Sequence, residues 1–126
     1  MLNDDQINRL VAEAMGIPCW HEWNDPVGHG FKIKFTCSGC GQKRYRSHIP
    51  ANPDYCNDLT FAFEFVGKLV AEGWNWEFRV SKNFTSAITY HPGRADNTSI
   101  SGDSNKLPRA ICIAGLKATG RWPEGE

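Results

Sequence analysis

Four potential metal ligands occur in two closely spaced pairs in the first third of the chain. The first pair is the C-x-H of Cys19 and His21, and the second is the C-x-x-C-G formed by Cys37, Cys40 and Gly41. Thiolates and a neutral imidazole are the ligands of closed, tetrahedral zinc sites, and C-x-x-C is the spacing typical of one half of such a site. The sequence therefore predicts a structural zinc ion bound by Cys19, His21, Cys37 and Cys40.

Two alternatives concern the identity and the role of this site. His29 or His48 could replace His21 as the fourth ligand. A catalytic zinc needs an open coordination position, which a set of four protein ligands does not leave. A zinc deaminase needs His-x-Glu followed by Pro-Cys-x-x-Cys. Here Glu22 directly follows His21 and no proline precedes Cys37, so the sequence favours a protein that is not an enzyme.

Composition sets the bounds of this prediction. The 126 residues, 40% of them hydrophobic and 22% charged, suit one globular domain with a small appended module. The 14 basic residues equal the 14 acidic residues, so the net charge does not favour general affinity for nucleic acid. The first residues show no signal-peptide pattern, and no apolar run approaches the roughly 20 residues of a membrane span. We expect a cytoplasmic protein without membrane contact, in which reducing conditions favour metal over disulfides.

Residues 17–50 are expected to form a zinc-binding hairpin module. Strands at residues 31–35 and 42–46 would flank the C-x-x-C-G turn, as in a zinc knuckle. A possible nucleic-acid contact follows this turn, near Trp20 and Trp23, and comprises Lys43, Arg44, Tyr45 and Arg46. Zinc knuckles use such basic and aromatic surfaces on single strands. The simpler interpretation, an exposed strand edge guarded by cations, agrees better with the zero net charge.

Periodicity predicts the remaining elements. A helix is expected over residues 4–15, ended by Gly16, and a second one from about residue 54–58 to Glu72. The second helix has an apolar stripe of Leu59, Ala62, Phe63, Val66, Leu69 and Val70. Alternating aromatic residues predict a strand over 74–80, paired with 84–90. Residues 91–106 are polar and predict a long mobile loop. A last helix spans 108–119, packing through Ala110, Ile111, Ala114 and Leu116, and residues 121–126 form a flexible tail.

The start of the second helix is a possible contact for an anion or small ligand. Tyr55, Asn57 and Asp58 lie in a polar run at a helix N-terminus, which is the positive end of the helix dipole. Asn57 and Asp58 are more simply explained as helix caps. Cys56 and Cys112 lie on or beside predicted helices, far in sequence from the ligand pairs, and are expected to be core residues.

A family resemblance rests on three segments. The run Asn52 to Leu59, Gly73-Trp74 at the start of an aromatic strand, and Leu107 to Cys112 at the start of the last helix resemble the phage ABA-sandwich domain family, members of which often carry an upstream C-x-H…C-x-x-C segment. The resemblance implies a helix–sheet–helix sandwich over residues 51–120, phage origin and expression in the bacterial cytosol. It implies no particular activity.

These observations lead to one expectation for fold and function. The fold class is α+β: an N-terminal helix over residues 1–16, a zinc hairpin over 17–50 and an antiparallel sheet layered between helices over 51–120. The expected function is that of a non-catalytic phage accessory protein with structural zinc, which binds a host protein or a small ligand. The alternatives are a single-stranded nucleic-acid-binding protein and, less favoured, a small zinc enzyme.

Overall fold

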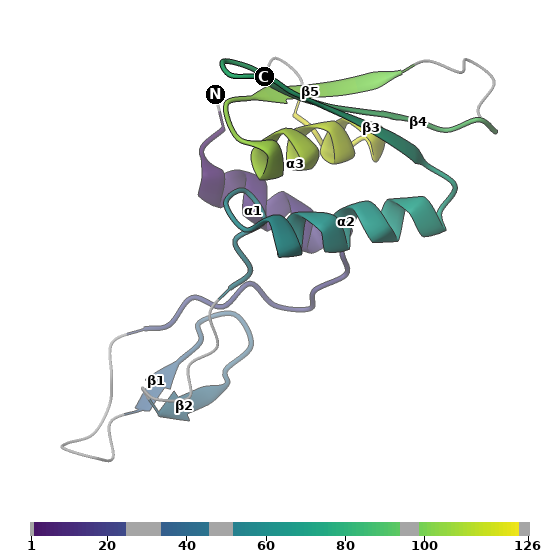
Figure 1. The fold of residues 1–126 in the computed structure, drawn as a ribbon. Helices are drawn as coiled ribbons and strands as arrows, with labels where there is room; N and C mark the ends of the chain where they lie inside the picture. The colour runs from purple at the N-terminus through teal and green to yellow at the C-terminus, as the bar shows by residue number, and fades with distance from the viewer. Residues whose placement is uncertain (1, 25–33, 46–51, 94–98, 124–126) are drawn as a thin grey trace. The chain divides into compact units, whose positions relative to one another are not determined.

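The computed structural model describes residues 2–24, 34–45, 52–93 and 99–123, which form an α+β fold with three helices, a three-stranded sheet and a small hairpin (Figure 1). The chain divides into two compact units. Unit 1 comprises Met1–Gly16 and Pro53–Glu126, and unit 2 comprises Ile17–Asn52. The predicted α+β class is confirmed.

Helix α1, Asp4–Ala14, begins in a capping box. The side chain of Asn3 accepts from the backbone N–H of Gln6 at 2.8 Å, and the Gln6 side chain accepts from the backbone N–H of Asn3 at 2.9 Å. Ile7, Val11 and other residues of one face are buried. The helix predicted over 4–15 is confirmed.

Helix α2, Leu59–Ala71, is capped by Asp58, whose side chain accepts from the backbone N–H of Thr60 at 2.9 Å. Its buried face consists of Ala62, Phe65, Val66 and Leu69. The predicted stripe was partly wrong, because Leu59, Phe63 and Val70 remain 42%, 41% and 54% exposed. Apolar residues surround most of this helix, so periodicity alone did not determine which side would meet the core.

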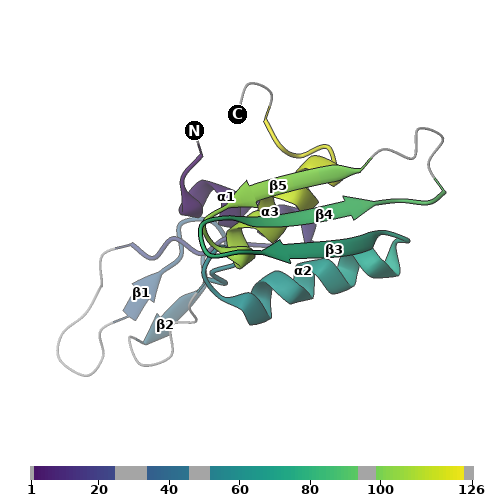
Figure 2. The same cartoon turned by 45° about the horizontal axis from the view of Figure 1, so that its top comes forward.

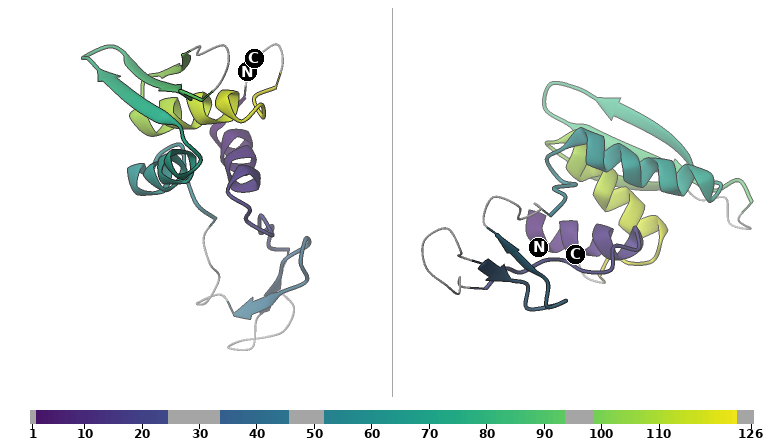
Figure 3. Two further views of the ribbon diagram at one scale, coloured as in Figure 1. Left: turned by 90° about the vertical axis from the view of Figure 1, so that its right-hand side faces the viewer. Right: turned by 90° about the horizontal axis from the view of Figure 1, so that it is seen from below.

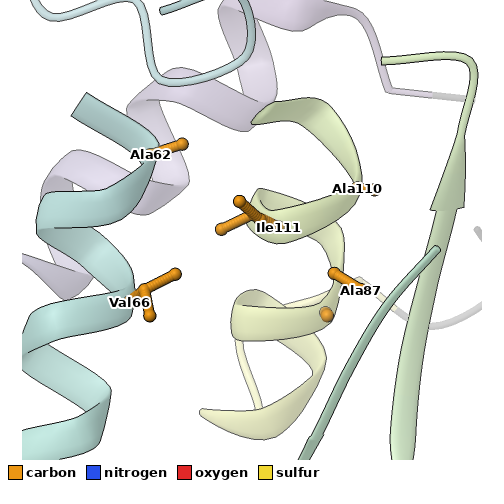
Figure 4. Packing of buried hydrophobic residues seen from close by; sticks show 6 residues of the cluster. Ala62, Val66, Ala87, Ala110 and Ile111 are labelled. Atoms are coloured by element: carbon orange, nitrogen blue, oxygen red, sulfur yellow. The ribbon is translucent and has the colours of Figure 1, made fainter. Parts of the chain in front are cut away.

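Helix α3, Leu107–Ala118, lies at the centre of unit 1. Every residue from Ala110 to Leu116 is buried, because the sheet packs on one side of α3 while α1 and α2 pack on the other. Figure 4 shows Ile111 of α3 between Ala62 and Val66 of α2 and Ala87 of the sheet. Gly115 permits the close approach of α2, since a Cβ there would lie 2.3 Å from the ring of Phe65.

The sheet of unit 1 contains β3 (Asn75–Val80), β4 (Thr85–Tyr90) and β5 (Ile100–Ser104), antiparallel and in the order β3-β4-β5. The predicted hairpin is confirmed, but the long loop predicted over 91–106 was wrong where β5 lies. The sequence Ile-Ser-Gly-Asp-Ser is too polar to resemble a strand. Its Gly102 sits against α3, where a Cβ would lie 2.4 Å from the carbonyl oxygen of Ala110.

All three helices lie on one side of this sheet (Figures 1 and 3), so the layers are the sheet, then α3, then α1 and α2. This order differs from the helix–sheet–helix order that the resemblance implies. The opposite face carries the exposed side chains of Asn75, Glu77, Arg79, Ser101 and Asp103. One-sided covering agrees with the apolar–polar alternation of β3, because a sheet covered on both faces would be apolar on both.

In unit 2, strands β1 (Lys34–Thr36) and β2 (Lys43–Tyr45) pair antiparallel, with Phe35 opposite Arg44. The predicted strand over 31–35 falls mainly outside the described residues. At the C-terminal end of unit 1, the backbone N–H groups of Arg121 and Trp122 donate to the carbonyl of Leu116, so the predicted tail begins as ordered chain. Among the described residues, no helix has the length and apolar character needed to cross a membrane.

Candidate metal centre

The side chains of Cys19, His21, Cys37 and Cys40 converge in unit 2. Their four potential ligand atoms all lie within 4.8 Å of one another, and no other such group of three or more His, Cys, Asp or Glu occurs among the described residues. The sulfur atoms of Cys19 and Cys37 are 3.7 Å apart. Nδ1 of His21 lies 3.4 Å from the sulfur of Cys37 and 3.6 Å from that of Cys40. The two halves predicted from sequence therefore meet in space.

Three of the six separations among the ligand atoms match the edges of a tetrahedron around one ion, and the others do not exceed 4.8 Å. Zinc lies about 2.3 Å from sulfur and about 2.05 Å from nitrogen, and tetrahedral angles then separate two sulfurs by about 3.8 Å and a sulfur from a nitrogen by about 3.6 Å. The observed separations of 3.7, 3.4 and 3.6 Å agree with these values. The cluster could thus hold a metal ion.

Backbone hydrogen bonds join the two halves of the site. The segment of residues 19–24 runs beside the hairpin: Asn24 N–H donates to the carbonyl of Thr36 at 2.8 Å, and Ser38 N–H donates to that of Glu22 at 2.9 Å. Trp23 and Cys37 form an isolated antiparallel bridge between these two segments. This pairing aligns C-x-H with C-x-x-C, although 15 residues separate them.

The turn of the knuckle is formed by the backbone of the C-x-x-C-G sequence itself. The N–H of Gly41 donates to the carbonyl of Cys37 at 3.0 Å, and the N–H of Cys37 donates to that of Gln42 at 2.9 Å. Gly41 has a φ of 76°, a left-handed conformation that favours glycine. A Cβ at Gly39 would lie 3.2 Å from the sulfur of Cys19, so glycine also leaves space for this sulfur.

His21 is held from two sides. The side-chain amide of Asn52 accepts from the backbone N–H of His21 at 3.1 Å and donates to its carbonyl at 2.8 Å. The imidazole stacks on the ring of Trp23 with centroids 5.2 Å apart. Sequence reasoning missed this role of Asn52, because no local pattern links a residue to a backbone 31 positions away.

The proton affinities of two ligand sulfurs differ sharply in the metal-free cluster. A hydrogen bond from the backbone of Cys40, assisted by the ring of His21, lowers the pKa of Cys37 from 9.0 to about 5. Burial and the neighbouring thiols of Cys40 and Cys37 raise the pKa of Cys19 to about 12. Like-charge repulsion therefore disfavours a second thiolate, and a bound cation would relieve it.

The predicted nucleic-acid residues are only partly described. Lys43 and Arg44 lie on β2 with exposed side chains, and as neighbours in a strand they face opposite sides of the hairpin. Tyr45 ends β2, and Arg46 lies outside the described residues, as do the alternative ligands His29 and His48. Trp20 and Trp23 are half-buried rather than fully exposed.

The predicted anion contact has structural partners within unit 1. Asp58 is the cap of α2, as the simpler interpretation had it, and Tyr55 is buried. The amide nitrogen of Asn57 donates to the carboxylates of Asp54 and Asp4. The side-chain N–H groups of Asn57 therefore already donate to carboxylates of the same chain. Cys56 and Cys112 are both fully buried, which confirms the prediction of core cysteines.

The carboxylate of Asp4 also joins α1 to α3. It accepts from Nζ of Lys106 at 2.9 Å and from Nε of Arg109 at 3.0 Å. Hydrogen bonding by Lys106, with further contributions from Asn57 and Arg109, lowers the pKa of Asp4 below its ordinary value. This network stabilises unit 1 and was not predicted, because the partners of Asp4 lie 53 to 105 residues from it in sequence.

Comparison of the chain with protein-family models, with curated proteins and with solved structures finds no match. The resemblance to the phage ABA-sandwich domain family therefore remains a prediction. The conclusion for the site depends on its geometry: three cysteines and one histidine, from two segments of unit 2, form a cluster that could hold a metal ion.

Proposed function

We propose that unit 2 binds one structural zinc ion and that the protein is a non-catalytic binding protein. The observation that carries this proposal is the convergence of three sulfurs and one imidazole nitrogen within 4.8 Å of one another, with three of their separations at tetrahedral spacing. Sulfur-rich tetrahedral sets favour zinc among the common cellular divalent metals, and four protein ligands occupy all positions of such a site. Zinc here would hold the chain together rather than activate water.

A structural role also agrees with the composition of unit 2. Among the described residues of this unit, Cys37 is the only buried apolar side chain. A segment whose described residues bury so little apolar surface needs another source of folding free energy, and metal binding supplies it in zinc fingers. The metal would fix the geometry of the β1–β2 hairpin, which could then present its exposed side chains to a partner.

The first experiment measures the metal content of the protein purified without added metal. We expect one zinc per chain, and loss of it in Cys37→Ser and in His21→Ala. Matched controls are Cys56→Ala and His91→Ala, which change a cysteine and a histidine outside the cluster and should retain the metal. Zinc retained in His21→Ala but lost in His29→Ala or His48→Ala would assign the fourth ligand differently, and a metal-free wild-type protein would refute the proposal.

The biological setting follows only from the resemblance. A phage-encoded accessory protein in the cytoplasm of the bacterial host, with a host protein or a small ligand as its target, agrees with a small protein whose metal site is closed. Purified protein that turns over a nucleotide or nucleic-acid substrate would contradict the non-catalytic part of this proposal.

A second candidate function is binding of single-stranded nucleic acid by the hairpin. The exposed side chains of Lys43 and Arg44 support it, since cations neutralise phosphates. Fluorescence anisotropy with a labelled single-stranded oligonucleotide at low salt tests it directly. Binding that Arg44→Ala weakens, while the matched exposed-cation control Lys82→Ala does not, would support this candidate; absence of binding at low salt would remove it.

A further inference from the structure

The outer edge of β3 has no partner strand among the described residues. The order β3-β4-β5 makes β3 a terminal strand, and no described strand pairs with its other side. Figure 2 shows β3 at the border of the sheet, alongside α2. An exposed edge of six residues presents a row of backbone donors and acceptors that can pair with another strand. This edge is therefore the part of unit 1 best suited to join another sheet.

Exposed apolar side chains gather around this edge. Of the six large hydrophobic residues that are exposed among the described ones, only Tyr90 lies outside α2, β3 and the β3–β4 turn; the others are Leu59, Phe63, Val70, Val80 and Phe84. Phe63 contacts Phe78 of β3, with ring centroids 5.5 Å apart in an edge-to-face arrangement. The turn contains a hollow of about 120 Å³ lined in part by Val80 and Phe84. We call this the β3–α2 surface.

The charges of β3 are complementary to those of a second, antiparallel copy of the same strand. Glu77 and Arg79 project from the polar face, with side chains 58% and 65% exposed, and form an exposed ion pair with each other at 3.5 Å. Trp76, Phe78 and Val80 alternate with them on the apolar face. In an antiparallel pair of two β3 strands centred on Phe78, Glu77 of each copy lies opposite Arg79 of the other. Trp76 of each copy then lies opposite Val80, beside the hollow.

Neighbouring registers are unfavourable. A shift by two residues places Glu77 opposite Glu77, or Arg79 opposite Arg79, and like charges directly opposite each other destabilise a strand pair. A shift by one residue turns the apolar face of one copy toward the polar side of the other. Only the register centred on Phe78 combines opposite charges with continuous apolar faces.

We propose that the β3–α2 surface pairs with the same surface of a second copy, giving a two-fold symmetric dimer with a continuous six-stranded sheet. A two-fold axis perpendicular to the sheet keeps the helices of both copies on one side. The α2 helices then lie antiparallel beneath the β3–β3 pair, and they cover the exposed stripe of Leu59, Phe63 and Val70.

The size of this surface sets the expected affinity. A strand of six residues and a helix of 13 residues are each about 20 Å long. With sheet and helix layers about 10 Å apart, the face presented by each copy measures roughly 20 by 20 Å. Two such faces bury roughly 800 Å² in total, which is less than the about 1,200 Å² of stable interfaces and falls in the range of weak, transient ones. We therefore expect a micromolar dissociation constant rather than a permanent dimer.

The experiment is a charge exchange followed by analytical ultracentrifugation of the full chain over a range of micromolar concentrations. The wild-type protein should show a monomer–dimer equilibrium. Arg79→Glu should raise the dissociation constant about ten- to a hundredfold, because both charge pairs of the dimer become repulsive. Glu77→Arg should act in the same way, and the double variant Glu77→Arg/Arg79→Glu should restore dimerisation because it restores opposite charges.

The side chains of Glu77 and Arg79 are exposed, so these variants should fold like the wild-type protein. Circular dichroism checks that they do. Asp103→Arg is the matched control, since it reverses an exposed charge on β5, at the other edge of the sheet, and should leave the dimer intact. Chelation of metal should also leave the dimer intact, because unit 1 alone carries the β3–α2 surface. A monomer at all concentrations, or a double variant that stays dissociated while folded, would overturn the proposal.

Discussion

The two units of this chain differ in what holds them together. In unit 1, three helices and a sheet bury a continuous set of apolar side chains around α3. In the described part of unit 2, Cys37 is the only buried apolar side chain, and it belongs to the Cys/His cluster. Burial of apolar area can stabilise a unit by itself, whereas a short hairpin with as little buried apolar area as the described part of unit 2 depends on its cross-link. Each unit should therefore respond to perturbations that leave the other unchanged.

The largest expected effect is that of metal removal. We expect a chelator to unfold unit 2 while unit 1 stays folded, because apparent zinc-binding free energies of about 10–16 kcal/mol exceed anything a short hairpin gains by packing. Amide hydrogen exchange measures both units in one sample: protection in β1 and β2 should vanish, and protection in α3 should persist. Retained protection in the hairpin without metal would show that the two units do not differ in this way.

The reverse perturbation is Phe65→Ala. This side chain is fully buried against Gly115, so its truncation should lower the free energy of unfolding of unit 1 by about 3–5 kcal/mol. The zinc content should remain unchanged, because the cluster lies in the other unit. Denaturant unfolding measures the loss. Phe63→Ala, the change of an exposed phenylalanine on the same helix, is the matched control and should cost less than half as much. An equal loss in both variants would contradict the assignment of the buried face.

A smaller effect is the contribution of Asp4 to the stability of unit 1 at acidic pH. Because Lys106 and its neighbours lower the pKa of Asp4 from 3.8, Asp4 stabilises unit 1 above that pH, and this contribution disappears as the pH falls through the lowered value. In Asp4→Asn, the free energy of unfolding should therefore fall less steeply as the pH decreases below about 4. Its side chain is 37% exposed, so solvent screening limits the loss to about 1 kcal/mol. Asp5→Asn, which removes an exposed pair with Arg9, is the control and should lower the free energy of unfolding at neutral pH by less than Asp4→Asn does.

The smallest expected effect concerns the number of protons that zinc binding releases, which should differ by one. In the folded, metal-free arrangement Cys37 has a pKa of about 5 and is a thiolate at neutral pH, but in an unfolded unit 2 it returns toward 9.0 and is protonated. If metal removal unfolds unit 2, zinc binding near neutral pH should release one proton more than binding to a preformed cluster. Calorimetry in buffers of different ionisation enthalpy counts these protons. In Cys37→Ser, both the release of this proton and the tight binding of zinc should be lost.

Local sequence predicted those parts of the fold in which neighbouring residues carry the signal. Helical periodicity identified α1, and the alternation of Trp76 and Phe78 with polar residues identified β3. The metal cluster was predicted for the same reason, since the spacing within each ligand pair is local. Whether the two pairs meet depended on the pairing of residues 22–24 with residues 36–38, which no local pattern encodes.

The errors have a common physical cause. Strand β5 was missed because Ser101, Gly102 and Asp103 have low strand propensity, and only the pairing with β4 and the close approach of α3 make this segment extended. Phe65 was left out of the stripe of α2 because Phe63 fits the periodicity equally well. The contact with Gly115 selected Phe65 for the core.

The sequence by itself determined the helices, the β3–β4 hairpin and the chemistry of the four ligands, because periodicity, capping and ligand spacing act over a few residues. Only the tertiary structure decided that α3 lies at the centre, that the helices share one side of the sheet and that α2 leaves an apolar stripe beside the outer edge of β3. These features depend on which apolar surfaces meet. Many pairings bury similar area, and the small residues Gly102 and Gly115 select among them by permitting the closest packing.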